Sequence, residues 1–189
     1  MLKIVGGKHR GRALMAPEGD ATRPTASRAR EALFNILMHA KWREDGTSPL
    51  LEARVLDAFA GTGALGLEAL SRGAAHVTFL DSDVKAVRLI GENVARLGET
   101  GAAKVVRGDA MRPPPGRDPC DLVFLDPPYR SGHAAPALAA LAAAGWVAPG
   151  AVVTVELAHN EDIVPPAGFE AIDERRYGAA KIVILRRAS

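Results

Sequence analysis

Short apolar segments alternate with amphipathic segments along most of the chain. Apolar runs typical of strands lie at residues 76–80, 104–106, 121–125, 151–157, 169–173 and 181–185, and another begins at Arg54. Helical spacing of apolar residues occurs at 26–41, 83–97 and 136–144, and a further helix ends near Arg72. This alternation predicts an α/β fold: a Rossmann-like, doubly wound, mostly parallel seven-stranded sheet whose last strands form an antiparallel hairpin.

The first residues follow a different pattern. Leu2–Val5 and Arg12–Met15 flank a turn containing Gly6 and Gly7, which predicts a small β-hairpin arm. A hairpin of this size has to pack against the rest of the protein to be stable. With 189 residues, 48% of them hydrophobic, we expect one domain: an arm at 1–22, a helix and linker at 23–50, and a Rossmann-like core at 51–189.

The apolar run at 121–125 ends abruptly in Asp126, Pro127, Pro128 and Tyr129, which we call the ledge. Successive apolar residues favour a strand buried on both faces, and two prolines make the following segment rigid. Open α/β sheets bind ligands at the carboxyl ends of their strands. There, a carboxylate and a proline carbonyl can accept both N–H groups of a nucleobase amine while the tyrosine ring stacks on the base. The alternative is a structural strand end, in which the acid caps a turn and the tyrosine covers the core.

A glycine-rich turn follows the first strand of the predicted core. Gly61, Gly63 and Gly66 form a Gly-x-Gly-x-x-Gly pattern between a strand and a helix. Asp81 comes about 20 residues later, at the end of the next strand, where it can accept hydrogen bonds from ribose hydroxyls. The pattern predicts a nucleoside-containing cofactor, although an ordinary tight turn with a helix-capping acid would look the same.

Asp57 indicates which cofactor the turn would bind. An acid just before the turn would repel a pyrophosphate but attract the ammonium and sulfonium groups of S-adenosylmethionine, so we favour this methyl donor over NAD. Asp109, which ends the third strand, is placed to accept from the adenine amino group, unless it is a simple turn aspartate. Neighbouring positions complete the predicted cofactor set: Phe59, Ser82, Ala110 and, from the ledge, Asp126.

Basic residues are concentrated near the start of the chain. The net charge is only +2, yet residues 1–30 hold seven lysines and arginines against two acids. Such an arm suits a phosphate backbone, although a solvated charged surface accounts for most basic runs. The predicted nucleic-acid contacts are Lys8, Arg10, Arg12, Arg23, Arg28 and Arg30.

Composition argues against several classes of protein. Cys120 is the single cysteine, and neither it nor the five scattered histidines have metal-ligand spacing, so we expect no disulfide and no metal. The start of the chain lacks the apolar core of a signal peptide. The longest weakly apolar tract, 134–148, is interrupted by Pro136 and Gly145 and is too short to span a bilayer. We expect a soluble, cytoplasmic monomer with no membrane partner.

In order and spacing, the glycine turn, Asp81, Asp109 and the ledge resemble the class I S-adenosylmethionine-dependent methyltransferases. The Asp-Pro-Pro-Tyr sequence matches those that modify amino groups of nucleic-acid bases. Residues 23–35, Arg-Pro-Thr-Ala-Ser-Arg-Ala-Arg-Glu-Ala-Leu-Phe-Asn, preceded by Gly-Gly at 6–7 and Arg-Gly-Arg at 10–12, resemble the signature of the bacterial 16S rRNA guanine-N2 methyltransferases. The resemblance covers nearly the whole chain, and this N-terminal signature is its most specific part.

The resemblance implies methyl transfer from S-adenosylmethionine to the exocyclic N2 of one guanine in 16S rRNA, within an assembling small ribosomal subunit. Asp126 and the carbonyl of Pro127 would hold the amino group, Tyr129 would stack on the base, and Thr25 would close over the cofactor. Asp81 stands where many relatives carry glutamate, which shortens the reach to the ribose.

Other functions stay open at this point. An adenine-N6 or cytosine-N4 methyltransferase could share the ledge, although no added target-recognition domain is evident in 189 residues. A protein-amide methyltransferase would favour asparagine in place of Asp126. A cofactor-binding RNA chaperone or assembly factor without turnover belongs to a different class. Arg175, Arg176, Tyr177 and Lys181 fit either an RNA-facing surface or an ordinary charged strand end.

Overall fold

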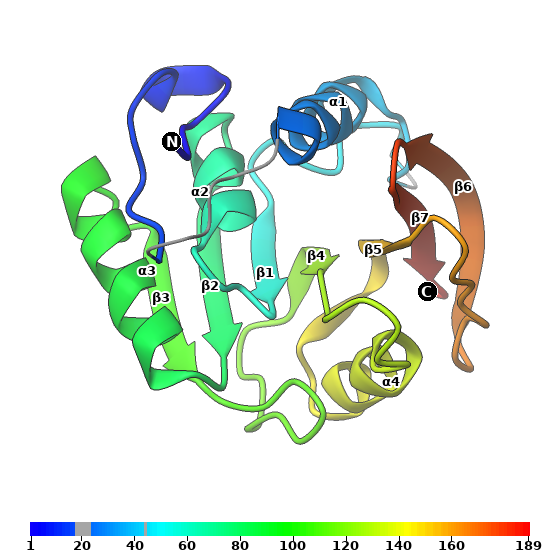
Figure 1. The fold of residues 1–189 in the computed structure, drawn as a ribbon. Helices are drawn as coiled ribbons and strands as arrows, with labels where there is room; N and C mark the ends of the chain where they lie inside the picture. The colour runs from blue at the N-terminus through cyan, green and yellow to red at the C-terminus, as the bar shows by residue number, and fades with distance from the viewer. Residues whose placement is uncertain (18–23, 44) are drawn as a thin grey trace.

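The computed structural model describes residues 1–17, 24–43 and 45–189, and for residues 24–27 it describes the backbone alone. Its centre is a seven-stranded sheet in the order β3-β2-β1-β4-β5-β7-β6 (Figure 1). The strands from β3 to β5 in this order run parallel, and β7 runs antiparallel to both β5 and β6. The predicted α/β sheet with an antiparallel C-terminal hairpin is therefore confirmed. The strands are β1 (Arg54–Ala58), β2 (His76–Asp81), β3 (Ala103–Arg107), β4 (Cys120–Leu125), β5 (Val147–Ala158), β6 (Phe169–Tyr177) and β7 (Ala180–Arg187).

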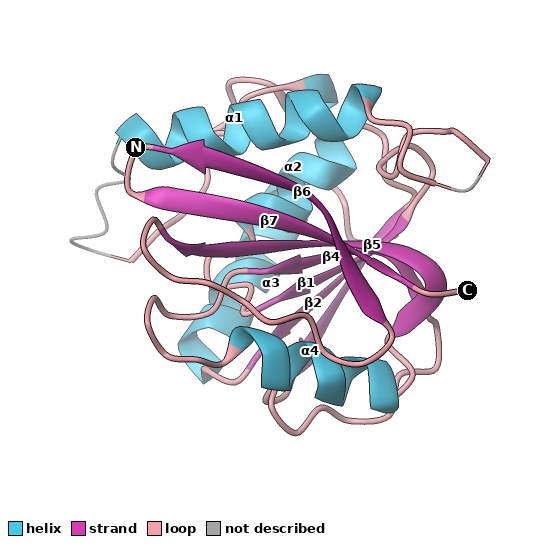
Figure 2. Ribbon diagram, turned by 90° about the vertical axis from the view of Figure 1, so that its right-hand side faces the viewer, coloured by secondary structure: helices cyan, strands magenta, loops and turns pink. Residues whose placement is uncertain are grey.

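Helices of the described segments cover both faces of the sheet (Figures 1 and 2). One face packs against α1 (Pro24–His39), α2 (Ala64–Ser71) and α3 (Val84–Leu97), and the other packs against α4 (Ala134–Ala143). Successive strand residues alternate between the two clusters: Val55 lies on the α1–α3 side and Leu56 on the α4 side. Burial on both faces explains why the inner strands β4 and β5 are mostly apolar, whereas the edge strands β3 and β6 carry charged residues.

Strand β5 begins earlier than the sequence predicts. It starts at Val147 instead of residue 151 and includes Pro149 and Gly150. Its pairing with β4 shifts register between Cys120 and Leu122. The irregularity accommodates a proline that could not donate to a regular ladder.

The N-terminal arm folds back on itself and lies on the α1–α3 side of the sheet. Its backbone pairs through one antiparallel bridge between Lys3 and Ala13, and a short 3-10 helix, η1 (Gly7–His9), closes the loop. Leu2 and Ile4 are buried in the cluster formed with α1–α3. The predicted arm is thus present, as a bridge and a tight turn in place of two regular strands.

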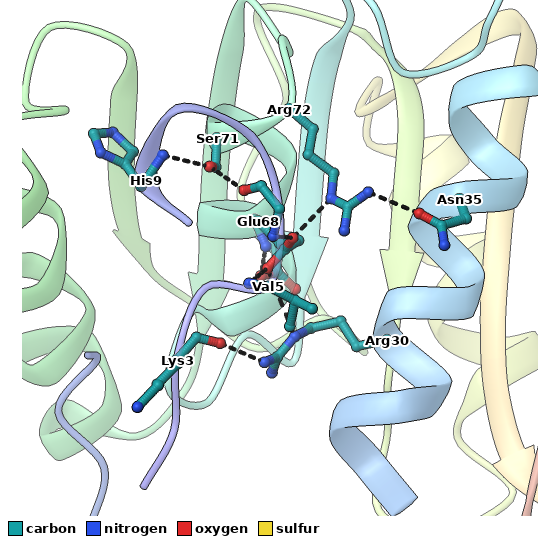
Figure 3. A network of polar contacts seen from close by, with 11 residues as sticks. Lys3, Val5, His9, Arg30, Asn35, Glu68, Ser71 and Arg72 are labelled. Atoms are coloured by element: carbon teal, nitrogen blue, oxygen red, sulfur yellow. Dashed lines mark hydrogen bonds and ion pairs between the residues drawn. The ribbon is translucent and has the colours of Figure 1, made fainter. Parts of the chain in front are cut away.

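The carboxylate of Glu68 fastens this arm to α2 (Figure 3). It is fully buried and accepts hydrogen bonds from the backbone N–H groups of Val5 at 2.8 Å and Gly6 at 2.7 Å. Arg72, one turn later in α2, donates to it at 2.7 Å, and Arg30 of α1 faces it at 3.9 Å. Because a buried charge without such partners is costly, Glu68 holds three segments in one arrangement.

Ser71 adds a second attachment point for the arm (Figure 3). Its hydroxyl accepts the N–H of His9 at 2.9 Å and donates to the carbonyl of Gly6 at 2.5 Å. Gly7 has a left-handed φ of 73°, and a Cβ at this position would lie 1.8 Å from the carbonyl oxygen of Ser71. The glycine pair is therefore what allows the arm to approach α2 so closely.

Gly66 allows α2 to pack closely on β2, since an added Cβ would lie 2.3 Å from Phe79 Cε1 and 2.7 Å from Val77 Cγ1. We expect Gly66→Ala to lower the free energy of unfolding by about 1–3 kcal/mol, measured by urea denaturation, because the ring has to move. Gly91→Ala in α3 is the matched control: its Cβ would meet nothing within 4 Å. It should leave stability unchanged or raise it by up to about 1 kcal/mol. Equal effects of the two changes would contradict the packing argument.

Removing the charge of Glu68 should destabilise the protein strongly. Glu68→Gln leaves Arg30 and Arg72 facing a neutral group in a buried site, so the free energy of unfolding should fall by about 3–5 kcal/mol. The control is Glu92→Gln, which breaks an exposed pair with Arg88 on α3 and should cost less than about 1 kcal/mol. Chemical denaturation at neutral pH compares them, and a small loss for Glu68→Gln would refute its role as the fastening point.

Candidate functional site

The glycine turn and the ledge meet at one edge of the sheet. Strand β1 leads into the turn, its parallel neighbour β4 leads into the ledge, and both strands end on the same side. The turn is sharply folded: φ is 59° at Phe59, 55° at Gly61 and 76° at Gly63, which is also the N-cap residue of α2. Left-handed conformations therefore recur at every second position of this turn, and at Phe59, which has a Cβ, this conformation is strained.

A cavity of about 620 Å³, the cofactor cavity, lies beside the glycine turn. Four of the predicted cofactor residues line it: Asp57, Phe59, Gly61 and Asp126. Sequence reasoning missed the other lining residues, which come from the arm, the turn, α2 and the start of α3: Pro17, Ala60, Thr62, Ala64, Leu65, Asp83, Lys85, Ala86 and Leu89. Mostly apolar walls with a few convergent polar groups are typical of a small-molecule site.

Asp57 supplies a buried carboxylate to the cofactor cavity. It is 1% exposed, and its Oδ2 accepts the N–H of Gly66 at 2.8 Å. Burial raises the pKa of Asp57 to about 7, the hydrogen bond from Gly66 opposes this rise, and the nearby charge of Asp81 adds to it. A cationic ligand group would offset the desolvation of this carboxylate. These residues therefore fit the ammonium and sulfonium groups of S-adenosylmethionine better than they fit a pyrophosphate.

A second cavity of about 490 Å³, the ledge cavity, adjoins the first. It is lined by the whole ledge and by residues from the ends of β1, β2 and β5: Phe59, Asp81, Ser82, Asp126, Pro127, Pro128, Tyr129 and Glu156. Phe59 and Asp126 line both cavities. A group bound in one cavity would therefore lie next to a group bound in the other, which is the arrangement that a two-substrate transfer reaction needs.

Glu156 of β5 is a member of the ledge cavity that sequence reasoning missed. The hydroxyl of Tyr129 donates to its Oε1 at 2.6 Å. Burial raises the pKa of Asp126 well above its ordinary value, and the charges of Glu156 and then Asp57 raise it further. The available signal was a single acid in the apolar run 151–157. Its partners, however, depend on the pairing of β5 with β4.

Asp81, the predicted ribose contact, lines the ledge cavity, whereas Asp109, the predicted adenine contact, lies in a turn outside both cavities. Asp81 accepts the N–H of Gly61 at 2.8 Å, which fixes the glycine turn, and together with Ser82 it lines the ledge cavity. Asp109 accepts the N–H of Met111 at 2.8 Å and lines neither cavity, and Ala110 is buried. The bond to Met111 is one that a turn aspartate makes, and the adenine contact of Asp109 stays a prediction.

Most of the predicted basic contacts that the structure describes are exposed. Arg10 and Arg28 are exposed, and Lys8 stays 57% exposed while pairing with Glu99 at 2.7 Å. Arg12 is exposed, but its guanidinium donates to backbone carbonyls at the end of α3, including that of Leu97. Arg23 and the side chain of Thr25 lie outside the described residues.

Arg30 differs from these basic residues because it points into the protein. Its side chain is only 9% exposed, faces Glu68 and donates to the carbonyl of Lys3 at 2.6 Å. Burial is the main reason that its pKa is lowered. A guanidinium in this position cannot contact a phosphate on the surface. The prediction of Arg30 as a nucleic-acid contact is therefore wrong, and its role is structural.

Asn93 of α3 connects the arm to the glycine turn. Its side chain is 1% exposed, accepts the N–H of Met15 at 2.7 Å, and donates to the carbonyls of Met15 at 3.0 Å and Thr62 at 3.1 Å. Since Thr62 lines the cofactor cavity, the position of the arm and the shape of that cavity are linked through one amide. The sequence signal was a polar residue on the apolar side of an amphipathic helix.

Within the described residues, no helix is long and apolar enough to cross a membrane, and no three His, Cys, Asp or Glu side chains are arranged to hold a metal ion. Cys120 is buried, and burial raises the pKa of its thiol to about 12. A thiol with so high a pKa is a poor nucleophile.

Comparison with known proteins identifies relatives over nearly the whole chain. A family model described as conserved hypothetical protein 95 matches residues 2–186. The protein named ribosomal RNA small subunit methyltransferase D from Escherichia coli K12 is 40% identical over 156 residues, which cover 82% of this chain and 74% of that protein. The protein of the same name from Haemophilus influenzae is 33% identical over 182 residues, covering 94% and 89%. A solved structure from Escherichia coli, named as a candidate methyltransferase (yhhF), has a TM-score of 0.82 at 37% identity and covers 99% of this chain and 98% of its own.

Asp57 should make stability depend on pH in a defined direction. Because the pKa is about 7 in the folded protein against an ordinary 3.8, the folded state holds a proton between these values that the unfolded chain has lost. The contribution of Asp57 to stability therefore falls as pH rises from about 4 to about 7.

The isosteric change Asp57→Asn keeps an acceptor for the N–H of Gly66 but cannot ionise. We subtract the free energy of unfolding of the unmodified protein from that of the variant. This difference should be a few kcal/mol more positive at pH 8 than at pH 5. Urea unfolding of both proteins at the two pH values measures this difference. If the comparison gave the same value at both, the raised pKa would be wrong.

Proposed function

The chain belongs to the conserved hypothetical protein 95 family, together with the small-subunit rRNA methyltransferases D, and from this premise we propose that it methylates the exocyclic N2 of a guanine in 16S rRNA. Its methyl donor is S-adenosylmethionine, and its substrate is the rRNA of an assembling small subunit. The observation that carries the proposal is the convergence of Asp126, Glu156 and Tyr129 on one cavity that adjoins the cofactor cavity.

S-adenosylmethionine, when bound, supplies an electrophilic methyl group on a sulfonium centre. Asp57 and Asp126 supply the negative charge that holds its cationic groups, and Leu89 and Ala86 contribute apolar surface in the same cavity. Asp81 holds the N–H of Gly61 and keeps lone pairs with which it can accept hydrogen bonds from ribose hydroxyls. Asp109, which follows β3, is the proposed acceptor for the adenine amino group.

Two of the carboxylates that line the ledge cavity, Asp126 and Glu156, favour guanine over the other amino-bearing bases. Next to its amine, guanine carries a ring N1–H donor, whereas adenine and cytosine carry a ring nitrogen with a lone pair. An ionised carboxylate can only accept hydrogen bonds. Asp126 and the carbonyl of Pro127 can take the two N–H groups of the amine, and Glu156 can take the N1–H. For adenine or cytosine the same Glu156 would face a lone pair and repel it, which is the polar mismatch that gives strong discrimination.

Asp126 is also suited to receive the proton that the amine loses. Its raised pKa makes it a stronger base than an ordinary aspartate, and the cause is burial followed by the charges of Glu156 and Asp57. It accepts the hydrogen bond that orients the amine and stabilises the positive charge developing on nitrogen. Tyr129, held by its hydroxyl bond to Glu156, offers a ring for stacking of a base turned out of the RNA.

The arm and the start of α1 supply the contacts to the RNA backbone. Lys8, Arg10 and Arg28 have exposed side chains, and Arg12 is exposed as well. Neutralised phosphates would make binding strongly dependent on salt. The arm is anchored on α2 and linked through Asn93 to the glycine turn, so the bound RNA lies on the same rigid body as the cofactor cavity.

The reaction is tested by incubating the protein with methyl-labelled S-adenosylmethionine and, in parallel, unmodified small ribosomal subunits, free 16S rRNA and duplex DNA. Nucleoside analysis should find label in N2-methylguanosine from rRNA or subunits. Label in N6-methyladenosine or N4-methylcytidine would overturn the guanine assignment. No transfer to any of them would favour a cofactor-binding assembly factor.

Substitution of Asp126 tests whether the ledge is the reacting site. Asp126→Asn should reduce single-turnover transfer by about tenfold to a few hundredfold, because a charge-assisted hydrogen bond of about 1.5–3 kcal/mol and the proton acceptor are lost. Tyr129→Phe is the matched control, since it keeps the ring and removes the hydroxyl that donates to Glu156. An Asp126→Asn protein with normal single-turnover rates would rule out the ledge as the reacting site.

The pH profile tests the link between the carboxylates. Activity should rise with pH as Asp126 ionises. Glu156→Gln should shift this rise to lower pH, because it removes one cause of the raised pKa of Asp126. Single-turnover rates across pH, with cofactor saturating, provide the measurement. An unmoved limb would mean that Asp126 does not set the profile.

A further inference from the structure

A third cavity lies next to the ledge cavity and has a different chemical character. It has a volume of about 450 Å³ and is lined by Tyr129, Arg130, Ala158, His159, Asn160 and Ala179. Tyr129 lines both cavities and is 49% exposed, with its hydroxyl held by Glu156. Its side chain therefore stands at the boundary between two spaces, only one of which the proposed target base would use.

The backbone around the third cavity is held in place. Glu161 accepts the N–H of Arg130 at 3.0 Å and that of Ala158 at 3.3 Å, and the N–H of His159 donates to the carbonyl of Ala179 at 2.9 Å. These bonds join the segment after the ledge, the end of β5 and the turn between β6 and β7. The carboxylate of Glu161 is engaged by these backbone donors and is not part of the lining, whereas the exposed side chains of Arg130 and His159 line the cavity.

Charge divides the two cavities. Asp81, Asp126 and Glu156 line the ledge cavity, whereas the described lining of the third cavity includes no acid and does include Arg130. A phosphate would be repelled by the carboxylates that line the first and attracted by the guanidinium that lines the second. An RNA strand with its target base in the ledge cavity would therefore direct its adjoining backbone toward Arg130.

We propose that the third cavity binds the nucleotide joined directly to the target guanosine, with its phosphate at Arg130 and its base next to Tyr129, within reach of His159 and Asn160. This inference rests on the proposed function and adds to it a second nucleotide subsite. Guanidinium, imidazole and amide groups beside an aromatic side chain are the usual elements of single-stranded RNA recognition.

Steady-state methylation of unmodified small subunits over a series of KCl concentrations tests the subsite. Arg130→Gln should lower kcat/KM about tenfold and reduce the slope of log kcat/KM against log salt by about 0.7, the value for one phosphate of a single strand. Arg130→Lys keeps the charge and should restore the slope. Neither change removes the backbone N–H that Glu161 accepts. Arg54→Gln is the control, a partly exposed arginine at the opposite end of β1.

Inhibition by small probes provides the second readout. Dinucleotides with guanosine on either side should inhibit the unmodified protein at least several-fold better than guanosine 5′-monophosphate does, and Arg130→Gln should remove this advantage. Failure of both dinucleotides to exceed the mononucleotide, or an Arg130→Gln salt slope equal to that of Arg54→Gln, would overturn the subsite. The proposed function would survive either result as long as the unmodified protein forms N2-methylguanosine, and it would fail separately if it does not.

Discussion

A single buried carboxylate determines how the parts of this protein are joined. Glu68 accepts two backbone N–H groups from the arm and lies against arginines from α1 and α2. If the arm moved away, the buried carboxylate would lose these partners at a large cost in free energy. The arm is therefore held in one position. From there Asn93 carries the constraint to the glycine turn, and the exposed lysine and arginines of the arm are fixed relative to the cofactor cavity.

The functional edge of the sheet concentrates negative charge that the isolated protein accommodates poorly. Asp57, Asp126 and Glu156 come from three adjacent strands, and the raised pKa values of the two aspartates record the cost of burial and mutual repulsion. A cation in one cavity and hydrogen-bond donors in the other would relieve it. The site is therefore complementary to its ligands at the expense of the ligand-free state, as expected where stability and function compete.

The sequence predicted those features that depend on local patterns. The sheet followed from apolar periodicity, and the glycine turn and the ledge are contiguous motifs at strand ends, where topology places ligands. Glu156, Asn93 and Arg30 could not be assigned in the same way, because their roles depend on strand register and on which distant backbone groups they reach. Arg30 shows this most clearly: as one of the basic residues in 1–30 it was predicted to contact phosphate, but in the fold its partner is an acid 38 positions away.

The end of β6 illustrates the same limit. The sequence ended this strand at residue 173, yet it continues to Tyr177 as the edge of the sheet. Arg175 and Arg176 pair with acids two positions earlier on their own strand. A run of charges at an edge discourages pairing with another chain, so it does not signal the end of a strand.

The attachment of the arm also bears on the order in which the molecule becomes complete during synthesis. Residues 1–15 are made first, but Glu68, Ser71, Asn93 and Glu99, which hold them, are made only when β1, α2, β2 and α3 have followed. The nascent arm therefore has no docking site until half of the chain exists. The basic surface acquires its final form only on a folded core, so a truncated or misfolded chain would not present it correctly.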